Sequence, residues 1–147
     1  RIQYGLGLNL TYKKLDFGVF FNGSAQRKIM INNAMTEFGE RNNNVMQWIA
    51  DDHWSIDNPN PDAAFPRLGL SNTDIKNNKE ASSHWLRNGN FIRFKTLEVG
   101  YSFPHCRVYF SGDNLAVWSP FKLWDPELSW NAYPLQRTFN FGVQLNF

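Results

Sequence analysis

Residues 138–147 read TFNFGVQLNF, and in this stretch every second residue is apolar. The apolar positions are Phe139, Phe141, Val143, Leu145 and Phe147, and the residues between them are polar or glycine. Because side chains along a β-strand point alternately to opposite faces, this pattern predicts a strand with one apolar and one polar face. About 9–11 such residues are enough to cross a bilayer at a steep tilt. We therefore predict a membrane-spanning strand, with Phe147 at a membrane interface, where it closes a transmembrane β-barrel.

The same alternation recurs in four other stretches of the chain. It holds without exception over the first twelve residues, and it returns after the tight turn at Lys13-Lys14. Pro104-His105 forms a second tight turn between two further alternating stretches. Phe20 interrupts the polar side of its strand, as an aromatic side chain packed inside a lumen would. The predicted strands of this all-β chain comprise residues 1–12, 15–22, 91–103, 106–115 and 138–147.

Short and long connections alternate between these predicted strands. The tight turns follow the first and third strands, whereas loops of residues 23–90 and 116–137 follow the second and fourth. Bacterial outer-membrane barrels have this arrangement, with short periplasmic turns and long extracellular loops. Within the longer loop, helical spacing of apolar residues predicts one or two short helices between residues 24 and 50. An irregular segment rich in Asp, Asn and Pro follows them.

The five predicted strands are too few to make a complete barrel. The smallest barrels need about eight strands, and an open sheet edge is not tolerated in lipid. The sequence also begins directly with a strand, without an apolar targeting segment. We therefore expect the chain to be the C-terminal segment of a larger barrel in a longer protein.

The composition excludes several other classes of protein. Hydrophobic residues make up 42% of the chain and charged residues 19%, which is unlike a disordered protein. A net charge of +2 without a basic run gives no indication of nucleic-acid binding. No apolar run is long enough for a transmembrane helix. Cys106 is the only cysteine, so the chain has no internal disulfide.

The polar faces of the predicted strands would line the lumen of the barrel. Residues on these faces could contact a transported solute, or they could only hydrogen-bond a plug and water, which is the interpretation we favour. Arg93 and Lys95 instead share the parity of the apolar face, at the loop end of their strand. The candidate lumen residues are Glu98, Arg107, Tyr109, Asp113 and Gln144.

Aromatic residues provide two further sets of candidates. Tyr12, Tyr101, Phe103 and Phe147 are expected together near the periplasmic boundary, where barrels carry an aromatic girdle. All six tryptophans lie in the two long loops or at their edge. They could contact a substrate or partner, or they could form small cores of the loops themselves, and the second interpretation is favoured for any single one. The candidate contacts in the last loop are Trp118, Trp124 and Trp130.

No pattern in the chain predicts catalysis, a metal site or a bound cofactor. Asp51, Asp52, Asp57 and Asp62 lie near His53, but their spacing matches no calcium or zinc motif. A solvated loop explains them better. No serine, cysteine or carboxylate pair stands in an activating arrangement that sequence can reveal, so the chain is not expected to be an enzyme.

Residues 84–104, HWLRNGNFIRFKTLEVGYSFP, resemble a stretch of the SusC-like (SusC/RagA-type) TonB-dependent outer-membrane transporters. In that family Trp-Leu-Arg, a Gly and Arg-x-Lys precede a Leu-x-x-Gly-Tyr-x-x-Pro strand. The chain departs from the pattern at Thr96, where Asn is usual, and in its unusually short turn after Phe103. Further matches in order are Trp54, Asn58-Pro59, Pro66-Arg67, Arg107, Tyr109, Ser111, Gly112, Asn114, Leu115, Asp125-Pro126-Glu127, Tyr133-Pro134 and Arg137-Thr138. The residues that resemble the barrel-assembly signal of such proteins are Asn140, Gly142, Leu145 and Phe147.

The resemblance implies the C-terminal five strands of a barrel of about 22 strands with an N-terminal plug, the plug being absent from this chain. It further implies a Bacteroidetes-type bacterial outer membrane, with extracellular long loops and a periplasmic C-terminus. The implied activity is nutrient import energised through the TonB complex, together with a SusD-like surface lipoprotein. Oligosaccharides or oligopeptides would be the cargo. The alternatives are a passive porin or a receptor of another family in the same outer membrane, and a soluble β-sandwich carbohydrate-binding module that uses its tryptophans.

Overall fold

The computed structural model of the chain describes residues 1–32 and 44–145. The chain forms two compact units. The first comprises Arg1–Ile29 and Arg87–Phe147, and the second comprises Met30–Leu86. Within the described residues, no helix has the length and apolar character needed to span a membrane.

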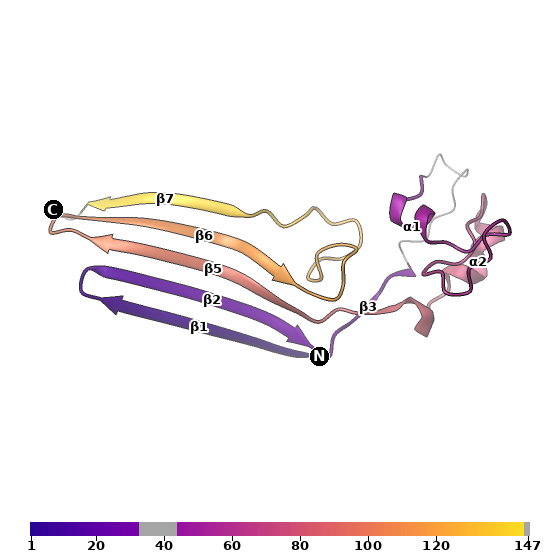
Figure 1. Cartoon of the computed structure of the whole chain (residues 1–147), viewed down its shortest axis with the longest axis horizontal. Coiled ribbons are helices and arrows are strands. Elements are labelled where there is room, and N and C mark those ends of the chain that lie inside the picture. The colour runs from indigo at the N-terminus through magenta and orange to yellow at the C-terminus, as the bar shows by residue number, and fades with distance from the viewer. Residues whose placement is uncertain (33–43, 146–147) are drawn as a thin grey trace. The chain divides into compact units, whose positions relative to one another are not determined.

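The first unit is built around one antiparallel sheet of five strands, in the order β1-β2-β5-β6-β7 (Figure 1). Both tight turns lie at one end of this sheet, which we call the turn end, and both long connections leave from the opposite loop end. Lys13 in the first turn has a φ of 56°, a positive value that two-residue hairpin turns require. The strands are β1 (Ile2–Tyr12), β2 (Leu15–Ala25), β5 (Phe91–Ser102), β6 (Cys106–Trp118) and β7 (Thr138–Leu145).

Two strands extend further than the sequence pattern predicts. The alternation predicts an end at Asn22 for β2 and at Leu115 for β6, but the structure continues them to Ala25 and Trp118. Strand β7 is described to Leu145, and the predicted interface residue Phe147 lies outside the described residues.

The pairing register gives the sheet one apolar and one polar face. Directly paired residues in neighbouring strands point to the same face, so rows of partners can be followed across all five strands. One apolar row consists of Leu10, Phe17, Val99, Phe110 and Phe141. The adjacent polar row consists of Asn9, Gly18, Glu98, Ser111 and Asn140. The alternation in the sequence is therefore realised in these rows across all five strands.

The apolar face is exposed rather than buried in a core. Leu6 is 70% exposed and Phe141 is 74% exposed, and every residue of β1 is exposed. A sheet with an apolar face is stable only when another layer covers that face. The described residues of this unit supply no second sheet opposite it, as the β-sandwich alternative would require. The cover must therefore come from outside the sheet.

A β-bulge in β5 corrects the predicted position of Arg93. Opposite β2, consecutive residues Phe20 and Phe21 pair with Thr96 and Phe94, which leaves Lys95 as an extra residue of β5. Opposite β6, the register is irregular at the same place, where it skips Lys95 on one strand and Asn114 and Leu115 on the other. One extra residue reverses which face the preceding side chains occupy. Arg93 pairs with Asn22 and lies on the polar face, so its predicted place on the apolar face is wrong.

The second unit has a small core of its own. It contains α1 (Gln47–Asp51), α2 (Asn72–Lys79) and the short 3₁₀ helix η2 (Ser83–Trp85). Helix α2 begins at a capping box, in which Ser71 and Asp74 each accept a hydrogen bond from the other's backbone N–H. The chain passes between the units through β3 (Lys28–Met30) and β4 (Leu86–Asn88), which pair with each other. The buried apolar residues are Ile31, Ile49, Phe65, Ile75 and Trp85.

Tryptophans of the long connection contribute to this core. The Trp48 and Phe65 ring centroids lie 5.3 Å apart, and those of Phe65 and Trp85 lie 6.2 Å apart. Trp85 is only 2% exposed. Helix α1 lies in the region, residues 24–50, where short helices are predicted. The described start of that region contains the end of β2 and strand β3 instead of a helix, and residues 33–43 lie outside the described residues.

Candidate functional site

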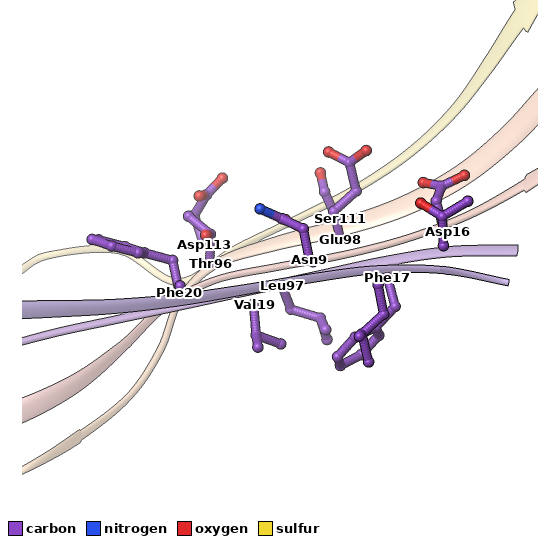
Figure 2. Close-up of a pocket in the computed structure, with 14 residues that line it drawn as sticks. Asn9, Asp16, Phe17, Val19, Phe20, Thr96, Leu97, Glu98, Ser111 and Asp113 are labelled. Carbon is purple, nitrogen blue, oxygen red and sulfur yellow. The ribbon is translucent and has the colours of Figure 1, made fainter.

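A hollow of about 580 Å³ lies on the polar face of the sheet. Gly7 and Gly18 leave it room, and Phe20 lies at one end of it on the polar side, as predicted. Figure 2 shows the polar side chains and Phe20 on one side of the strands, with Phe17, Val19 and Leu97 on the other. We call this cavity the polar hollow. Its polar lining is Asn9, Thr11, Asp16, Thr96, Glu98, Ser111 and Asp113.

Arg107 joins two carboxylates at the turn end of the polar hollow. Its Nη2 donates to Asp16 and, at 2.6 Å, to Glu98, while its Nε donates to Asp16 at 3.2 Å. The guanidinium carbon lies 5.2 Å from the centre of the Tyr109 ring. The structure thus brings together three predicted lumen residues, Glu98, Arg107 and Tyr109. Sequence reasoning missed Asp16 as the link between them.

The other two predicted lumen residues share this face but are placed differently. Gln144 is the direct partner of Arg107 in the β6–β7 pairing. Asp113 lies farther toward the loop end, pairs with Thr96 and is exposed. With Asp16, Glu98 and Asp113 against the single Arg107, carboxylates outnumber guanidinium groups along the hollow. The surface therefore suits polar or cationic groups, and within the described residues no acidic or histidine cluster has the geometry of a metal site.

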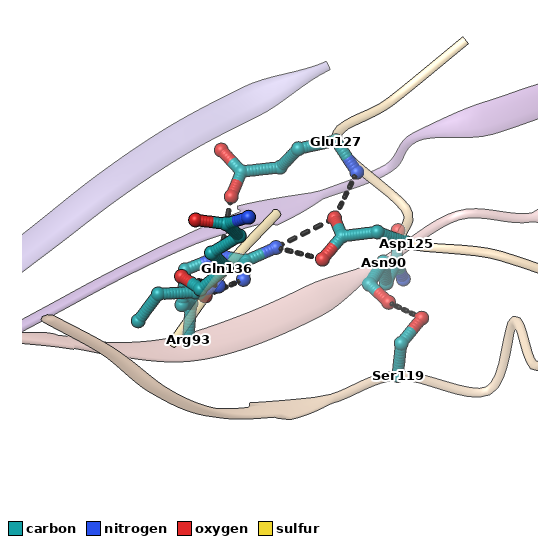
Figure 3. Close-up of polar contacts among 7 residues, drawn as sticks. Asn90, Arg93, Ser119, Asp125, Glu127 and Gln136 are labelled. Atoms are coloured by element: carbon teal, nitrogen blue, oxygen red, sulfur yellow. Dashed lines mark hydrogen bonds and ion pairs between the residues drawn. The ribbon is translucent and has the colours of Figure 1, made fainter. Parts of the chain in front are cut away.

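A second polar centre surrounds Arg93, which is 1% exposed (Figure 3). Its Nη2 donates to both carboxylate oxygens of Asp125, at 2.6 and 2.7 Å. Its Nε donates to Glu127 at 2.5 Å, and its Nη1 donates to the Asn114 side-chain oxygen. We call these four residues the Arg93 anchor. Because a buried charge is costly unless it is paired and hydrogen-bonded, the anchor fixes the β6–β7 loop to the sheet.

Other hydrogen bonds hold the two ends of the β6–β7 loop. Near its start, the Ser119 hydroxyl donates to the Asn90 carbonyl oxygen at 2.7 Å. Near its end, the Asn114 amide donates to the Gln136 carbonyl oxygen at 3.0 Å. Asn114 has a φ of 54°, which is the left-handed region that asparagine tolerates. The loop is therefore attached to the sheet at its start, at its centre and at its end.

The predicted contact residues Trp124 and Trp130 pack inside this loop. The ring centroids of Phe121 and Trp124 lie 4.8 Å apart, and those of Trp124 and Trp130 lie 5.2 Å apart. Phe121 is 6% exposed. This packing matches the interpretation in which loop tryptophans form a core of their own. Trp118 differs, because it ends β6, pairs with Ile92 on the apolar face and is 56% exposed.

The three described residues of the predicted assembly signal all lie within the β6–β7 pairing. Asn140 pairs with Ser111 on the polar face, and Leu145 pairs with Cys106 on the apolar face. Gly142 pairs with Tyr109, whose ring occupies the space that a Cβ atom on Gly142 would need. Packing of the Tyr109 ring therefore explains the glycine at position 142, in addition to any role of this residue in barrel assembly.

Aromatic residues mark both ends of the apolar face. At the turn end, Tyr12 and Tyr101 both pair with Leu15, and the Tyr101 and Phe103 ring centroids are 4.8 Å apart. At the loop end, Tyr4 and Trp118 occupy one row, and the alternation of the sequence alone does not predict that they lie together. Tyrosine and tryptophan are enriched where a bilayer meets water. The separation of the two groups therefore resembles a pair of membrane-interface girdles.

The chain is similar to known transport proteins, although no protein-family model matches it. Two relatives come from Formosa agariphila. TonB-dependent receptor P26 is 28% identical over 169 residues, covering 98% of this chain and 17% of that receptor. TonB-dependent receptor P3 is 27% identical over 169 residues, covering 97% of this chain and 16% of that receptor. The chain therefore spans about one sixth of these relatives.

Solved structures of the RagAB peptide importer have a matching fold. The open-open state aligns over 99% of this chain and 17% of that chain, with 26% identity and a TM-score of 0.69. The closed-closed state aligns over the same proportions, with 26% identity and a TM-score of 0.72. The resemblance to a segment of SusC-like TonB-dependent transporters, predicted from the motifs, is confirmed by these comparisons.

Proposed function

We propose that this chain, which resembles a segment of SusC-like TonB-dependent transporters over nearly its whole length, forms five adjacent wall strands of a larger outer-membrane β-barrel. The observation that carries the proposal is the single sheet with an exposed apolar face and an opposite polar face. A bilayer would cover the apolar face, because exposure of its large apolar side chains to water is unfavourable. Pairing of the outer edges of β1 and β7 with further strands would satisfy their free backbone groups.

The complete barrel would have about 22 strands and enclose a plug, as plugged transporters do. Its lumen would receive the polar hollow, where Asp16, Glu98 and Asp113 could contact the plug or a passing solute. The tight turns would be periplasmic and the long connections extracellular, because outer-membrane barrels have their long loops outside. In this orientation the Arg93 anchor lies toward the extracellular mouth of the barrel and holds the β6–β7 loop in a fixed position there.

The complete protein would import oligopeptides or oligosaccharides with energy supplied through the TonB complex. The similarity to receptors named TonB-dependent supports the energy source, and the similarity to the RagAB peptide importer supports a peptide cargo. A SusD-like surface lipoprotein is the proposed partner. The folded second unit and the anchored β6–β7 loop would then be the segments of this chain nearest to substrate and partner.

The four residues that resemble the assembly signal provide a separate proposal. The role of Asn140, Gly142, Leu145 and Phe147 would be to present their strand for insertion into the membrane. We expect Phe147→Ala to lower the amount of assembled barrel without changing substrate preference. Heat-modifiable mobility of the outer-membrane fraction on gels measures assembly, and unchanged assembly with an altered preference would contradict this role.

Uptake by cells tests the transport proposal. The complete protein would be expressed with its SusD-like partner, and uptake of labelled oligopeptides and oligosaccharides would be compared with and without a functional TonB. We expect uptake of one class of oligomer to be lost without TonB. Equal uptake in both strains would indicate a passive porin. A monodisperse, folded protein in buffer without detergent would contradict the membrane assignment itself.

A further inference from the structure

The apolar face contains a recess of about 510 Å³ at its loop end. Tyr4, Gly23, Ile92 and Trp118 form one row of paired residues across four strands there. Gly23 has no side chain, and the Tyr4 ring lies over it, where its hydroxyl donates to the Phe91 carbonyl oxygen at 3.0 Å. This hydrogen bond fixes the ring as one wall of the recess. We call this cavity the outer recess.

The lining of the outer recess is mainly apolar and includes one basic side chain. Ala25, Ile92, Trp118 and Pro120 contribute apolar surface to it, and Lys122 of the β6–β7 loop contributes the basic group. The lining also includes Ser24, Asn90 and Ser119. Ile92 is 46% exposed and Trp118 is 56% exposed. Within residues 1–32 and 44–145, no carboxylate forms an ion pair with Lys122, in contrast to Arg93 and Arg107. A mainly apolar recess that is lined by one lysine without a carboxylate partner matches an acyl chain with an anionic headgroup.

We propose that the outer recess binds one lipid with a phosphorylated headgroup. Its acyl chain would lie on Ile92 between the rings of Tyr4 and Trp118, and its phosphate would accept a hydrogen bond from Lys122. The inference rests on the proposed function, in which this face contacts the bilayer. The recess is continuous with that face and lies at its aromatic border, the depth at which headgroups and basic side chains meet.

Small residues distinguish this place from the rest of the wall. Gly23 and Ala25 alternate with Ser24 on β2, so β2 itself contributes no large side chain to the apolar face at the loop end. Near the centre of the sheet the same face carries the row Leu8, Val19, Leu97, Gly112 and Phe139, and the side chains of Leu115 and Phe139 lie close to where a Cβ atom of Gly112 would be. A lipid at the outer recess would therefore be retained more firmly than lipids elsewhere along these strands.

Native mass spectrometry of the complete, delipidated protein in detergent tests this site. The probes are dioleoyl phosphatidic acid and dioleoylglycerol, which have the same chains and differ in the phosphate. We expect Lys122→Gln to weaken binding of phosphatidic acid about fivefold, the effect of one basic residue at an anionic lipid surface. Binding of dioleoylglycerol should stay unchanged, and Lys122→Arg should restore phosphatidic acid binding. Ala25→Phe, which fills the apolar part, should weaken binding of both lipids.

Lys14→Gln provides the matched control, because Lys14 lies in the turn at the opposite end of the strands. It should leave the binding of both lipids unchanged. Equal effects of Lys122→Gln and Lys14→Gln on the binding of phosphatidic acid would contradict the proposed site. Occupation of the recess by a second copy of the protein in place of lipid would also contradict it. A protein that folds in buffer without detergent would instead contradict the proposed function, so the two failures are distinguishable.

Discussion

Arg93 and Asp125, separated by 32 residues in the chain, form a two-bonded ion pair in which Nη2 lies 2.6 and 2.7 Å from the two carboxylate oxygens. Arg93 is 1% exposed, and the Asp125 side chain is 15% exposed. Breaking an ion pair in such a position costs more than breaking one at a surface, because removal of one partner leaves a buried charge uncompensated. We therefore expect the pair to hold the central part of the β6–β7 loop on the sheet.

Arg93→Met should release the loop while leaving the strands in place. The variant leaves Asp125 and Glu127 without their cation, a change that typically costs about 3–5 kcal/mol. We expect faster amide hydrogen exchange across residues 119–137 in the complete protein, and little change in β5 and β6. Hydrogen exchange followed by mass spectrometry measures both segments in one experiment.

Lys95→Met is the matched control for this prediction. Lys95 lies two residues away in the same strand, is exposed and occupies the bulge. It should leave exchange in the loop unchanged. If Arg93→Met also leaves the loop protected, the anchor does not hold it.

The position of Arg93 also indicates what sequence reasoning could and could not supply. The strands were predictable because alternation follows directly from backbone geometry. The bulge left a trace as well, since Ile92 and Phe94 are apolar at even positions whereas Leu97 and Val99 are apolar at odd ones. A uniform alternation across Lys95 overlooks this change and puts Arg93 on the wrong face.

Contacts between distant segments could not be predicted in the same way. Nothing local connects Asp125 or Glu127 with Arg93, or Asp16 with Arg107, because these pairs depend on register across strands. The same holds for the packing of Phe121 with Trp124, since irregular loops have no periodicity to read. The sequence therefore predicts on which face of the sheet the candidate residues lie, but it predicts only some of the contacts between them.

Gly142→Ala should impair assembly through a clash with Tyr109. A methyl group on residue 142 would overlap the tyrosine ring, and overpacking of this kind costs about 1–3 kcal/mol. Replacing Tyr109 with alanine in the same chain should remove the clash and restore part of the loss. The folded fraction on heat-modifiability gels measures the effect.

Gly7→Ala serves as the control for the glycine variant. A Cβ atom at Gly7 would lie 3.4 Å from the Phe20 ring, which is ordinary contact. Gly7→Ala should therefore be tolerated. Equal losses from both glycine variants would contradict the specific role of the Tyr109 ring.

Arg107 should be less sensitive to the loss of one partner than Arg93. Its side chain is 23% exposed, and those of Asp16 and Glu98 are 30% and 49% exposed, so each pair is screened by water. Either Asp16→Asn or Glu98→Gln should lower the free energy of unfolding by about 1 kcal/mol or less, because the other carboxylate remains. Urea titration of the protein in lipid vesicles measures this difference. A loss as large as that of Arg93→Met would contradict the comparison.

Arginine substitutions on neighbouring residues of β7 should separate the two faces. Phe139 lies on the apolar face in the row of Leu8, midway between the rows of Tyr4 and Tyr12. Phe139→Arg should cost about 2–4 kcal/mol, the expected penalty for a cation facing the middle of the bilayer. Asn140→Arg points to the polar face and should cost far less. Similar losses in urea titrations of the two variants would contradict the assignment of the faces.

A spin-label scan of β7 tests the central claim, that one face of this sheet meets lipid and the other meets the lumen. After Cys106→Ser, single labels would be placed from Thr138 to Leu145 in the complete protein in lipid vesicles. We predict high accessibility to oxygen, which partitions into lipid, at positions 139, 141, 143 and 145. Positions 138, 140, 142 and 144 should show lower accessibility to oxygen. Accessibility without this two-residue period, or a water-soluble nickel reagent reaching Phe139 and Phe141 as readily as Asn140, would contradict the account.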